Sequence, residues 1–95
     1  MDLVFEWDEG KAVLNLKKHA VSFSEASTVW EDHFNIEFFD HEHSAEENRF
    51  LMVGESSDSR LLIISFTERE NKIRIISARE LTPAERRAYE HGYFE

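Results

Sequence analysis

Two nearly continuous apolar runs, Leu61–Ser65 and Ile73–Ile76, lie close together in the second half of the chain. Short apolar runs rich in isoleucine favour central strands that are covered on both faces. The segment Glu70–Lys72 between them has the composition of a turn, so the two strands are predicted to be antiparallel neighbours. A buried antiparallel hairpin therefore limits the fold more than any other feature of the sequence.

Further strands are expected around this hairpin. Aromatic and β-branched residues predict a short strand over residues 2–7. From about residue 35 the period of the pattern changes, and strands are predicted within residues 35–42, 48–56, 60–69 and 72–80. The sheet is thus expected to hold about four strands after the first one, with antiparallel neighbours.

Two helices are predicted between the first strand and the rest of the sheet. Asp8 can cap a helix over residues 10–19, in which Val13, Leu14 and Leu16 are expected to supply the apolar contacts. The second helix is expected to begin at Ser22 or Ser24, because Ser22 and Glu25 have the spacing of a capping box.

The last helix has the sharpest signal. Thr82, Pro83 and Glu85 place a cap, a first helical residue and a box-closing carboxylate in order, and Gly92 can end the helix. The predicted order is strand, two helices, a run of strands and a helix. This order is typical of a two-layer α+β domain, and no linker or repeat divides residues 1–95.

The composition of the chain excludes some kinds of site and makes some binding partners less favourable. The 95 residues contain no cysteine, which excludes disulfides and thiolate metal sites. The net charge of −9 disfavours nonspecific binding to a phosphate backbone, although residues 49–95 are neutral overall, with eight basic and eight acidic side chains. Neither a signal peptide nor an apolar run of about 20 residues is visible, so we expect a cytoplasmic protein without a membrane segment.

Several strings in the chain occur in the order found in one toxin family. They are FEWDEGKA, NLKKHAVSF, HSAEENR, RLLIISFTER, IRIISAR and TPAERRAYE, and together they span roughly residues 3–89. In this order and spacing the chain resembles the BrnT toxins. The resemblance implies a fold like that of the RelE toxins, RNA cleavage that halts translation, and a BrnA antitoxin whose complex with the toxin binds operator DNA.

The resemblance also implies an active site without a cofactor or a metal. Such cleavage needs attack by the 2′-hydroxyl, proton transfer, and cations around the reacting phosphate. His19 is the candidate for proton transfer and Lys18 and Arg79 for charge neutralisation, while Glu68 or Tyr89 is a candidate for assisting proton transfer. Each also has a structural interpretation: His19 as a helix-terminal residue, Lys18 as a surface lysine, Arg79 as an ion-pair partner and Tyr89 as a packing residue.

Arg60, Arg69 and Arg74 are better candidates for phosphate contact than for proton transfer. The alternative is that each pairs with a neighbouring glutamate on a solvated face. Strand alternation also puts Ser65, Thr67 and Arg69 on one face of their strand, and Ser77 and Arg79 on one face of the next. A three-residue loop would bring the two sets together, whereas a two-residue or four-residue loop would separate them.

Two local features remain open at the level of sequence. Asp40, His41, Glu42, His43 and Glu46 have metal-ligand chemistry, but without a third ligand at a defined spacing an acidic loop is favoured over a metal site. Ala20 stands where the family usually carries glycine. If this position needs a positive φ, alanine is strained there.

Two functions from different classes fit these observations. The first is a ribonuclease toxin, and the alternative is a non-catalytic binding module that acts with its antitoxin in transcriptional autoregulation. In both cases operator contacts are expected to come from the antitoxin, because the first half of the chain is acidic. The aromatic stretch Phe34–Phe39 carries more apolar side chains than one strand face can bury, which favours docking of a basic partner segment there.

Overall fold

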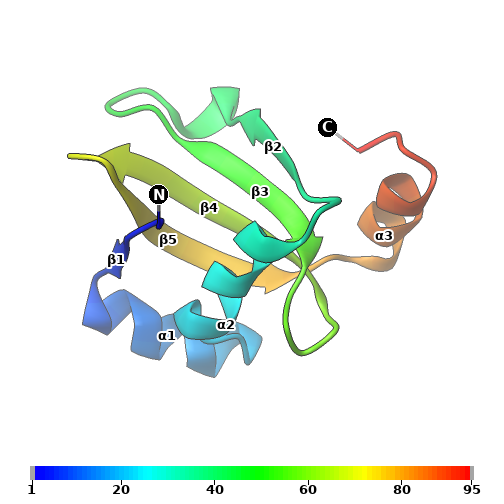
Figure 1. Ribbon diagram of the computed structural model, residues 1–95, viewed down its shortest axis with the longest axis horizontal. Coiled ribbons are helices and arrows are strands. Elements are labelled where there is room, and N and C mark those ends of the chain that lie inside the picture. Colours follow the sequence, from blue (N-terminus) through cyan, green and yellow to red (C-terminus); the bar gives the residue numbers. More distant parts are fainter. Residues whose placement is uncertain (1, 95) are drawn as a thin grey trace.

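A five-stranded sheet organises the molecule. The computed structural model describes residues 2–94, and the strands lie in the order β1-β5-β4-β3-β2 (Figure 1). Neighbouring strands are antiparallel except at β1, which pairs parallel to β5 at the sheet edge. The predicted α+β class is confirmed, but the parallel edge strand was not predicted. The strands are β1 (Phe5–Trp7), β2 (Ile36–Phe39), β3 (Phe50–Glu55), β4 (Leu61–Arg69) and β5 (Lys72–Glu80).

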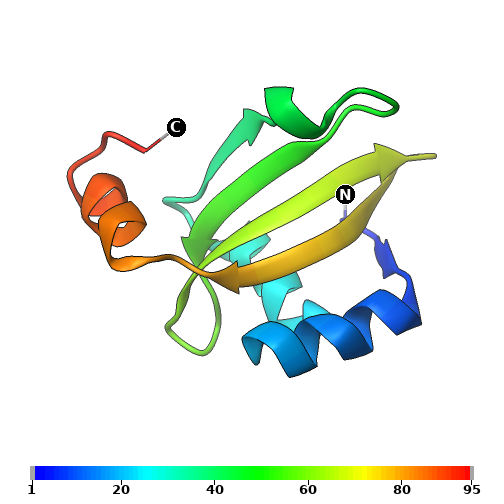
Figure 2. The ribbon, with the colours of Figure 1, turned by 180° about the vertical axis from the view of Figure 1, so that it is seen from behind.

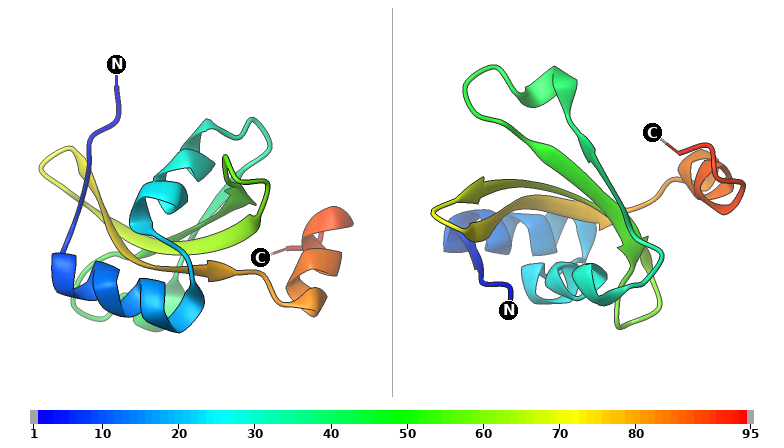
Figure 3. Two further views of the ribbon diagram at one scale, coloured as in Figure 1. Left: turned by 90° about the horizontal axis from the view of Figure 1, so that it is seen from below. Right: turned by 45° about the horizontal axis from the view of Figure 1, so that its top comes forward.

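Helical segments are divided between two parts of the sheet. The helix α2 (Phe23–Ser27) and the 3-10 segment η1 (Thr28–Glu31) pack on one face, called here the helical face, and α1 (Glu9–His19) runs along β5. Figure 3 shows that α3 (Pro83–Glu90) lies at one end of the sheet, away from these helices. The short segment η2 (His41–His43) follows β2. The caps predicted at Asp8 and Thr82 are confirmed, and Thr82 forms a complete capping box.

The main core lies between the helical face and α2 with η1. Alternate residues of β4, Leu62, Ile64 and Phe66, are fully buried there against Phe23 and Val29. Burial of each such side chain contributes about 1.5–3 kcal/mol. A smaller cluster, formed by Val53, Ile63, Leu81, Tyr89 and Phe94 with their neighbours, fixes α3 over one end of the opposite face, called here the open face.

The predicted apolar contacts of α1 are wrong. Val13, Leu14 and Leu16 are 52–66% exposed, and the one buried residue of the helix is Asn15. The Asn15 amide donates to the carbonyl of Ala78 at 2.8 Å and accepts from the Ala78 N–H at 3.0 Å. Because β1 pairs only with Ile73–Ile75, the β5 backbone at Ala78 has no strand partner on that side, and Asn15 satisfies it instead.

The hairpin between β4 and β5 contains two irregularities that matter for function. Arg69 pairs with Lys72, so the loop has two residues, Glu70 and Asn71, both with positive φ. With regular pairing this loop would place Ser77 on the face opposite Ser65. A bulge at Ile76 adds one residue to β5, and Ser65 is paired with Ser77.

Candidate active site

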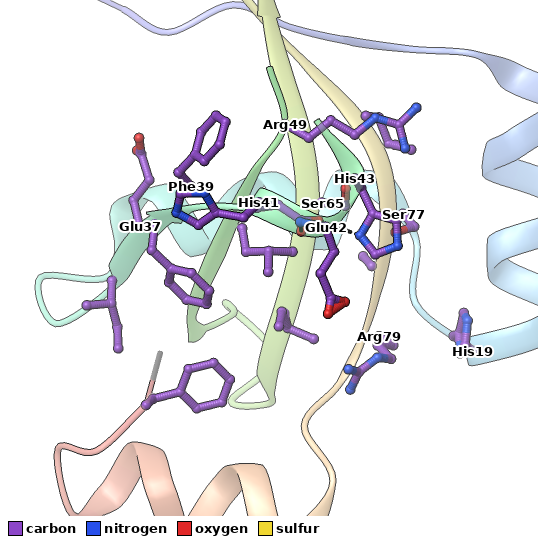
Figure 4. Close-up of a pocket in the computed structure, with 18 residues that line it drawn as sticks. His19, Glu37, Phe39, His41, Glu42, His43, Arg49, Ser65, Ser77 and Arg79 are labelled. Carbon is purple, nitrogen blue, oxygen red and sulfur yellow. Dashed lines mark hydrogen bonds and ion pairs between the residues drawn. The ribbon is translucent and has the colours of Figure 1, made fainter. Parts of the chain in front are cut away.

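A cleft of about 1070 Å³ lies on the open face of the sheet (Figure 4). Its floor is formed by β4 and β5. The walls come from the C-terminal end of α1, from β2 with η2, from the start of β3 with the residue before it, and from the segment after α3. In Figure 2 the sheet is seen from behind, with α3 beyond one end of β4 and β5. The polar and charged residues on its walls are His19, Glu37, Asp40, His41, Glu42, His43, Arg49, Ser65, Ser77 and Arg79.

Arg79 lies in this cleft because of the bulge. It is paired with Ile63 across the hairpin, on the same face as Ser65 and Ser77. If Ile76 were paired regularly instead, strand alternation would turn Arg79 toward the helical face. The bulge thus brings together the two residue sets whose alignment the sequence left open.

The Arg79 guanidinium is held by α3. It donates to both carboxylate oxygens of Glu85 at 2.7 and 3.0 Å and to the carbonyl of Glu80 at 3.1 Å. The hydrogen bond from Arg79 lowers the pKa of Glu85 to about 2, against the effect of burial. Three hydrogen bonds use three of the five N–H donors of an arginine, which leaves the Nε–H and one Nη2–H for an external oxygen. Arg79 can therefore pair with Glu85 and contact a phosphate at the same time.

His19 is the last residue of α1 and lies on the cleft wall next to Ser77 and Arg79. The helix ends there because Ala20 adopts a left-handed conformation, with φ of 57°, and its N–H donates to the carbonyl of Leu16. The sequence left open whether this position needs a positive φ, and the structure shows that it has one. Alanine is strained in this conformation by about 1 kcal/mol, but the turn that positions His19 is formed.

Lys18 lies beside the cleft, on the exposed surface of α1. It lines a neighbouring depression with Lys11, Lys17, His19 and Ser77. Among residues 2–94, none of these three lysines is in a salt bridge. Three lysines without a carboxylate partner thus lie next to the cleft.

Glu68 and Tyr89 do not join His19 and Arg79. Glu68 pairs with Ile73, whose side chain is in the helical-face core, so alternation turns Glu68 toward that face as well. Tyr89 packs in the smaller cluster, and its hydroxyl donates to the carbonyl of Phe34. Burial, with smaller contributions from Asp32 and Glu55, raises the pKa of Tyr89 and keeps its proton on the hydroxyl.

Arg60 is also apart from the cleft, on the side of α2. Its guanidinium binds the buried carboxylate of Glu25 and donates to the carbonyl of Ala20 at 2.9 Å. The Glu25 carboxylate accepts from Arg60 and Ser56, so the capping box predicted at Ser22 is only half formed. Arg60 links α1, α2 and β4, which is a structural role.

Arg69 and Arg74 lie near the turn of the hairpin, at the end away from Arg79. Arg69 pairs with Glu47 at 3.2 Å, and Arg74 pairs with Glu6 at 3.4 Å. Both share the open face with Ser65 by alternation, but neither lines the cleft. Each of Arg60, Arg69 and Arg74 therefore pairs with a glutamate in the structure, as the ion-pair interpretation expects.

Two groups in the cleft were not among the predicted site residues. Arg49, from the family-like segment HSAEENR, lines the cleft at the start of β3. In the same segment the His43 Nδ1 donates to the carboxylate of the buried Asp40 at 2.9 Å. The sequence predicted an acidic loop here, with a metal site as the alternative, and gave no sign of a hydrogen bond between His43 and Asp40. Among residues 2–94, no three His, Cys, Asp or Glu side chains are arranged to hold a metal ion.

The cleft also has an apolar part. Phe38 and Phe94, with ring centroids 5.9 Å apart, lie on its wall together with Ile36 and Leu51. Aromatic rings beside cations form the surface on which unpaired nucleotide bases stack. The arrangement can hold a phosphate and an adjacent base of a single strand at the same time.

Comparison with known proteins identifies the family. The sequence matches the model of the BrnT ribonuclease toxin of type II toxin-antitoxin systems over residues 7–85. The chain belongs to the BrnT family. Its fold is similar to the crystal structure of the Brucella abortus ribonuclease toxin BrnT, with a TM-score of 0.67 and 20% sequence identity over 85% of this chain and 99% of that one. A search of curated protein sequences gives no match.

Membership of the BrnT family makes the chain a member of a group of ribonuclease toxins from type II toxin-antitoxin systems. The predicted family and fold class are thereby confirmed. No helix within residues 2–94 has the length and apolar character needed to cross a membrane.

Proposed function

We propose that this BrnT-family chain is an endoribonuclease that cleaves RNA without a metal ion, arrests translation in the cytoplasm, and is neutralised by a BrnA-type antitoxin. The observation that carries the proposal is the cleft whose walls include an imidazole, His19, a guanidinium, Arg79, and aromatic side chains. These groups match the needs of the reaction, which are proton transfer, neutralisation of phosphate charge, and binding of unpaired bases.

In the proposed reaction the 2′-oxygen of the substrate attacks the adjacent phosphorus. The O2′–P bond forms and the P–O5′ bond breaks, so the products are a 2′,3′-cyclic phosphate and a free 5′-hydroxyl. The Arg79 N–H donors that Glu85 and Glu80 leave available stabilise the negative charge on the phosphate oxygens. His19 carries one of the two protons that must move, because the 2′-hydroxyl loses a proton and the 5′-oxygen gains one.

The net charge of −9 opposes approach of RNA, and the position of the lysines offsets it locally. Lys17 and Lys18 are exposed on α1 directly before His19, and the exposed Lys11 lines the same depression. At physiological ionic strength charges beyond about 8 Å are largely screened, so carboxylates far from the cleft oppose the strand little. The lysines then act against the nearer carboxylates of Glu37, Asp40 and Glu42 on the cleft wall. Lys18 is thus proposed to guide the strand, and Arg60, Arg69 and Arg74 are not part of the proposed site.

The direct test is cleavage of a single-stranded RNA by the purified chain in excess EDTA. We expect fragments that end in a 2′,3′-cyclic phosphate, and expect the variant His19→Gln to lose about 10²- to 10⁴-fold in rate. Intact RNA after incubation with the folded wild type would favour the alternative function, a non-catalytic module in transcriptional autoregulation. Cleavage only after adding a divalent cation would contradict the metal-independent mechanism.

The antitoxin is proposed to cover the acidic, aromatic end of β2. Phe34 is 83% exposed and Ile36 is 37% exposed, and the carboxylates of Asp32 and Glu55 lie nearby. A basic, apolar segment fits this surface. Phe34→Ser is expected to weaken binding of a BrnA-type antitoxin without lowering RNA cleavage. Binding of operator DNA is expected only from the toxin–antitoxin complex, and a footprint from this chain alone would contradict that view.

A further inference from the structure

Cleavage of RNA requires two proton transfers, and His19 supplies only one of them. Glu68 and Tyr89, the sequence-based candidates for the second transfer, lie outside the cleft. The cleft wall opposite α1 contains another imidazole, that of His43 at the end of η2. In Figure 4, His43, His19 and Arg79 project from three different elements around the floor formed by Ser65 and Ser77.

His43 is oriented by a buried carboxylate. The His43 Nδ1–H donates to Asp40 Oδ2 at 2.9 Å, while Asp40 Oδ1 accepts from the N–H of Glu42. The Asp40 side chain is 10% exposed, and its backbone is fixed by hydrogen bonds to Arg49 and Ser44. The His43 side chain is 63% exposed and lines the cleft. Because Nδ1 is bound to Asp40, Nε2 is the nitrogen left for a substrate.

We propose that His43 is the general base of the reaction and that Asp40 is its positioning residue, an inference that rests on the proposed ribonuclease function. Asp40 fixes the tautomer in which Nδ1 carries the proton and Nε2 accepts one, and its negative charge stabilises the imidazolium that forms. Nε2 takes the proton of the 2′-hydroxyl as the O2′–P bond forms. Protonated His19 gives its proton to the 5′-oxygen as the P–O5′ bond breaks, and solvent restores both imidazoles.

The test compares single-turnover cleavage of one RNA in EDTA by the purified wild type, His43→Gln, Asp40→Asn and His19→Gln. His33→Gln is the matched control, because His33 is exposed and outside the cleft. We expect a loss of about 10²- to 10⁴-fold for His43→Gln, partly restored by added imidazole, and at least about tenfold for Asp40→Asn. His33→Gln is expected to stay within about twofold of the wild type.

Two readouts separate catalysis from a structural role. A substrate with sulfur in place of the bridging 5′-oxygen needs no proton on its leaving group, so it should rescue His19→Gln and leave His43→Gln slow. Nitrogen-15 NMR should show the proton on Nδ1 of His43 in the wild type and on Nε2 in Asp40→Asn.

The failures of the two proposals are distinguishable. If the wild type does not cut RNA in EDTA, the ribonuclease proposal fails and the His43 assignment falls with it. If the wild type cuts and His43→Gln cuts within about threefold of it, only the His43 assignment is overturned. Rescue of His43→Gln by the sulfur substrate would overturn the base role in favour of an acid.

Discussion

The two ends of the hairpin formed by β4 and β5 carry the same residue type in different surroundings. At the turn, Arg69 and Arg74 extend from regular strands and pair with the carboxylates of Glu47 and Glu6. At the other end, the bulge turns Arg79 into the cleft beside His19, and Glu85 holds its guanidinium from one side. An arginine becomes a candidate for catalysis here through its position at an irregular point of the strand.

The largest expected contrast between the two ends is in activity. Arg79→Ala should lower the rate of RNA cleavage by about 10²- to 10³-fold, because it removes donors that stabilise charge in the transition state. Arg69→Ala, the matched variant at the turn, should stay within about threefold. Single-turnover rates with one RNA measure both. Equal losses of cleavage rate in Arg79→Ala and Arg69→Ala would show that the two ends of the hairpin do not differ in catalysis.

The acid stability of the two ends should also differ. Hydrogen bonding to Arg79 lowers the pKa of Glu85 from 4.5 to about 2. Because the folded-state pKa is lowered, the stabilisation is complete above about pH 4.5 and is lost as the pH falls toward 2. Glu85→Gln should remove on the order of 2 kcal/mol at pH 7 and should reduce the loss seen on acidification. Glu25, whose pKa is lowered by its hydrogen bond with Arg60, should supply the acid dependence that remains.

Glu47 provides the matched control for this measurement. The pKa of Glu47 is also lowered, chiefly by its hydrogen bond with Arg69, but this pair is exposed to solvent. Glu47→Gln should therefore leave the acid dependence of the free energy of unfolding close to that of the wild type. Urea denaturation between pH 2 and pH 7 tests this, and a flat profile in the wild type would contradict the assigned role of Glu85.

Backbone strain can be compared at the two ends in the same way. Ala20 beside the cleft and Glu70 in the turn both have positive φ, at 57° and 50°. Ala20→Gly and Glu70→Gly should each raise the free energy of unfolding by about 1 kcal/mol, because glycine has no Cβ to strain. Thermal denaturation measures the change. Destabilisation by Ala20→Gly would show that the left-handed turn after α1 is not the native one.

The smallest expected contrast concerns the lysines. Lys18→Ala should slow cleavage about threefold at low salt and reduce the salt dependence of RNA binding, because one phosphate contact is lost. Lys72→Ala, at the turn of the hairpin, should leave both unchanged. Binding titrations at several salt concentrations test this pair, and an identical effect of the two variants would contradict guidance of the strand by α1.

Much of the fold was predictable because local signals coincide with the final structure. The caps at Asp8 and Thr82, the apolar runs of β4 and β5, and the turn at Glu70 all act over a few residues. The contacts of α1 were not predictable, because its exposed leucines and its buried Asn15 depend on how far β1 extends along β5. The length over which β1 pairs with β5 is set by tertiary packing, which local sequence signals do not report.

The site was predictable only in part for a similar reason. His19 and Arg79 were identified from their residue types and the family resemblance, and the cleft contains both. The bulge at Ile76 has no signature in a run of isoleucines, so the alignment of Ser65 with Ser77 could not be derived. His43 depends on Asp40, whose burial is set by packing after β2 and is not visible in an acidic loop sequence.

The decisive measurement is where RNA binds on the hairpin of β4 and β5. A single-stranded RNA with 2′-deoxyribose at the mapped cleavage position lacks the attacking hydroxyl, so it binds without being cut. Titrated into the nitrogen-15-labelled chain, it should shift the NMR signals of His19, Ser65, Ser77 and Arg79 and leave those near Arg69 and Arg74 in place. Shifts confined to the turn of the hairpin would contradict the account.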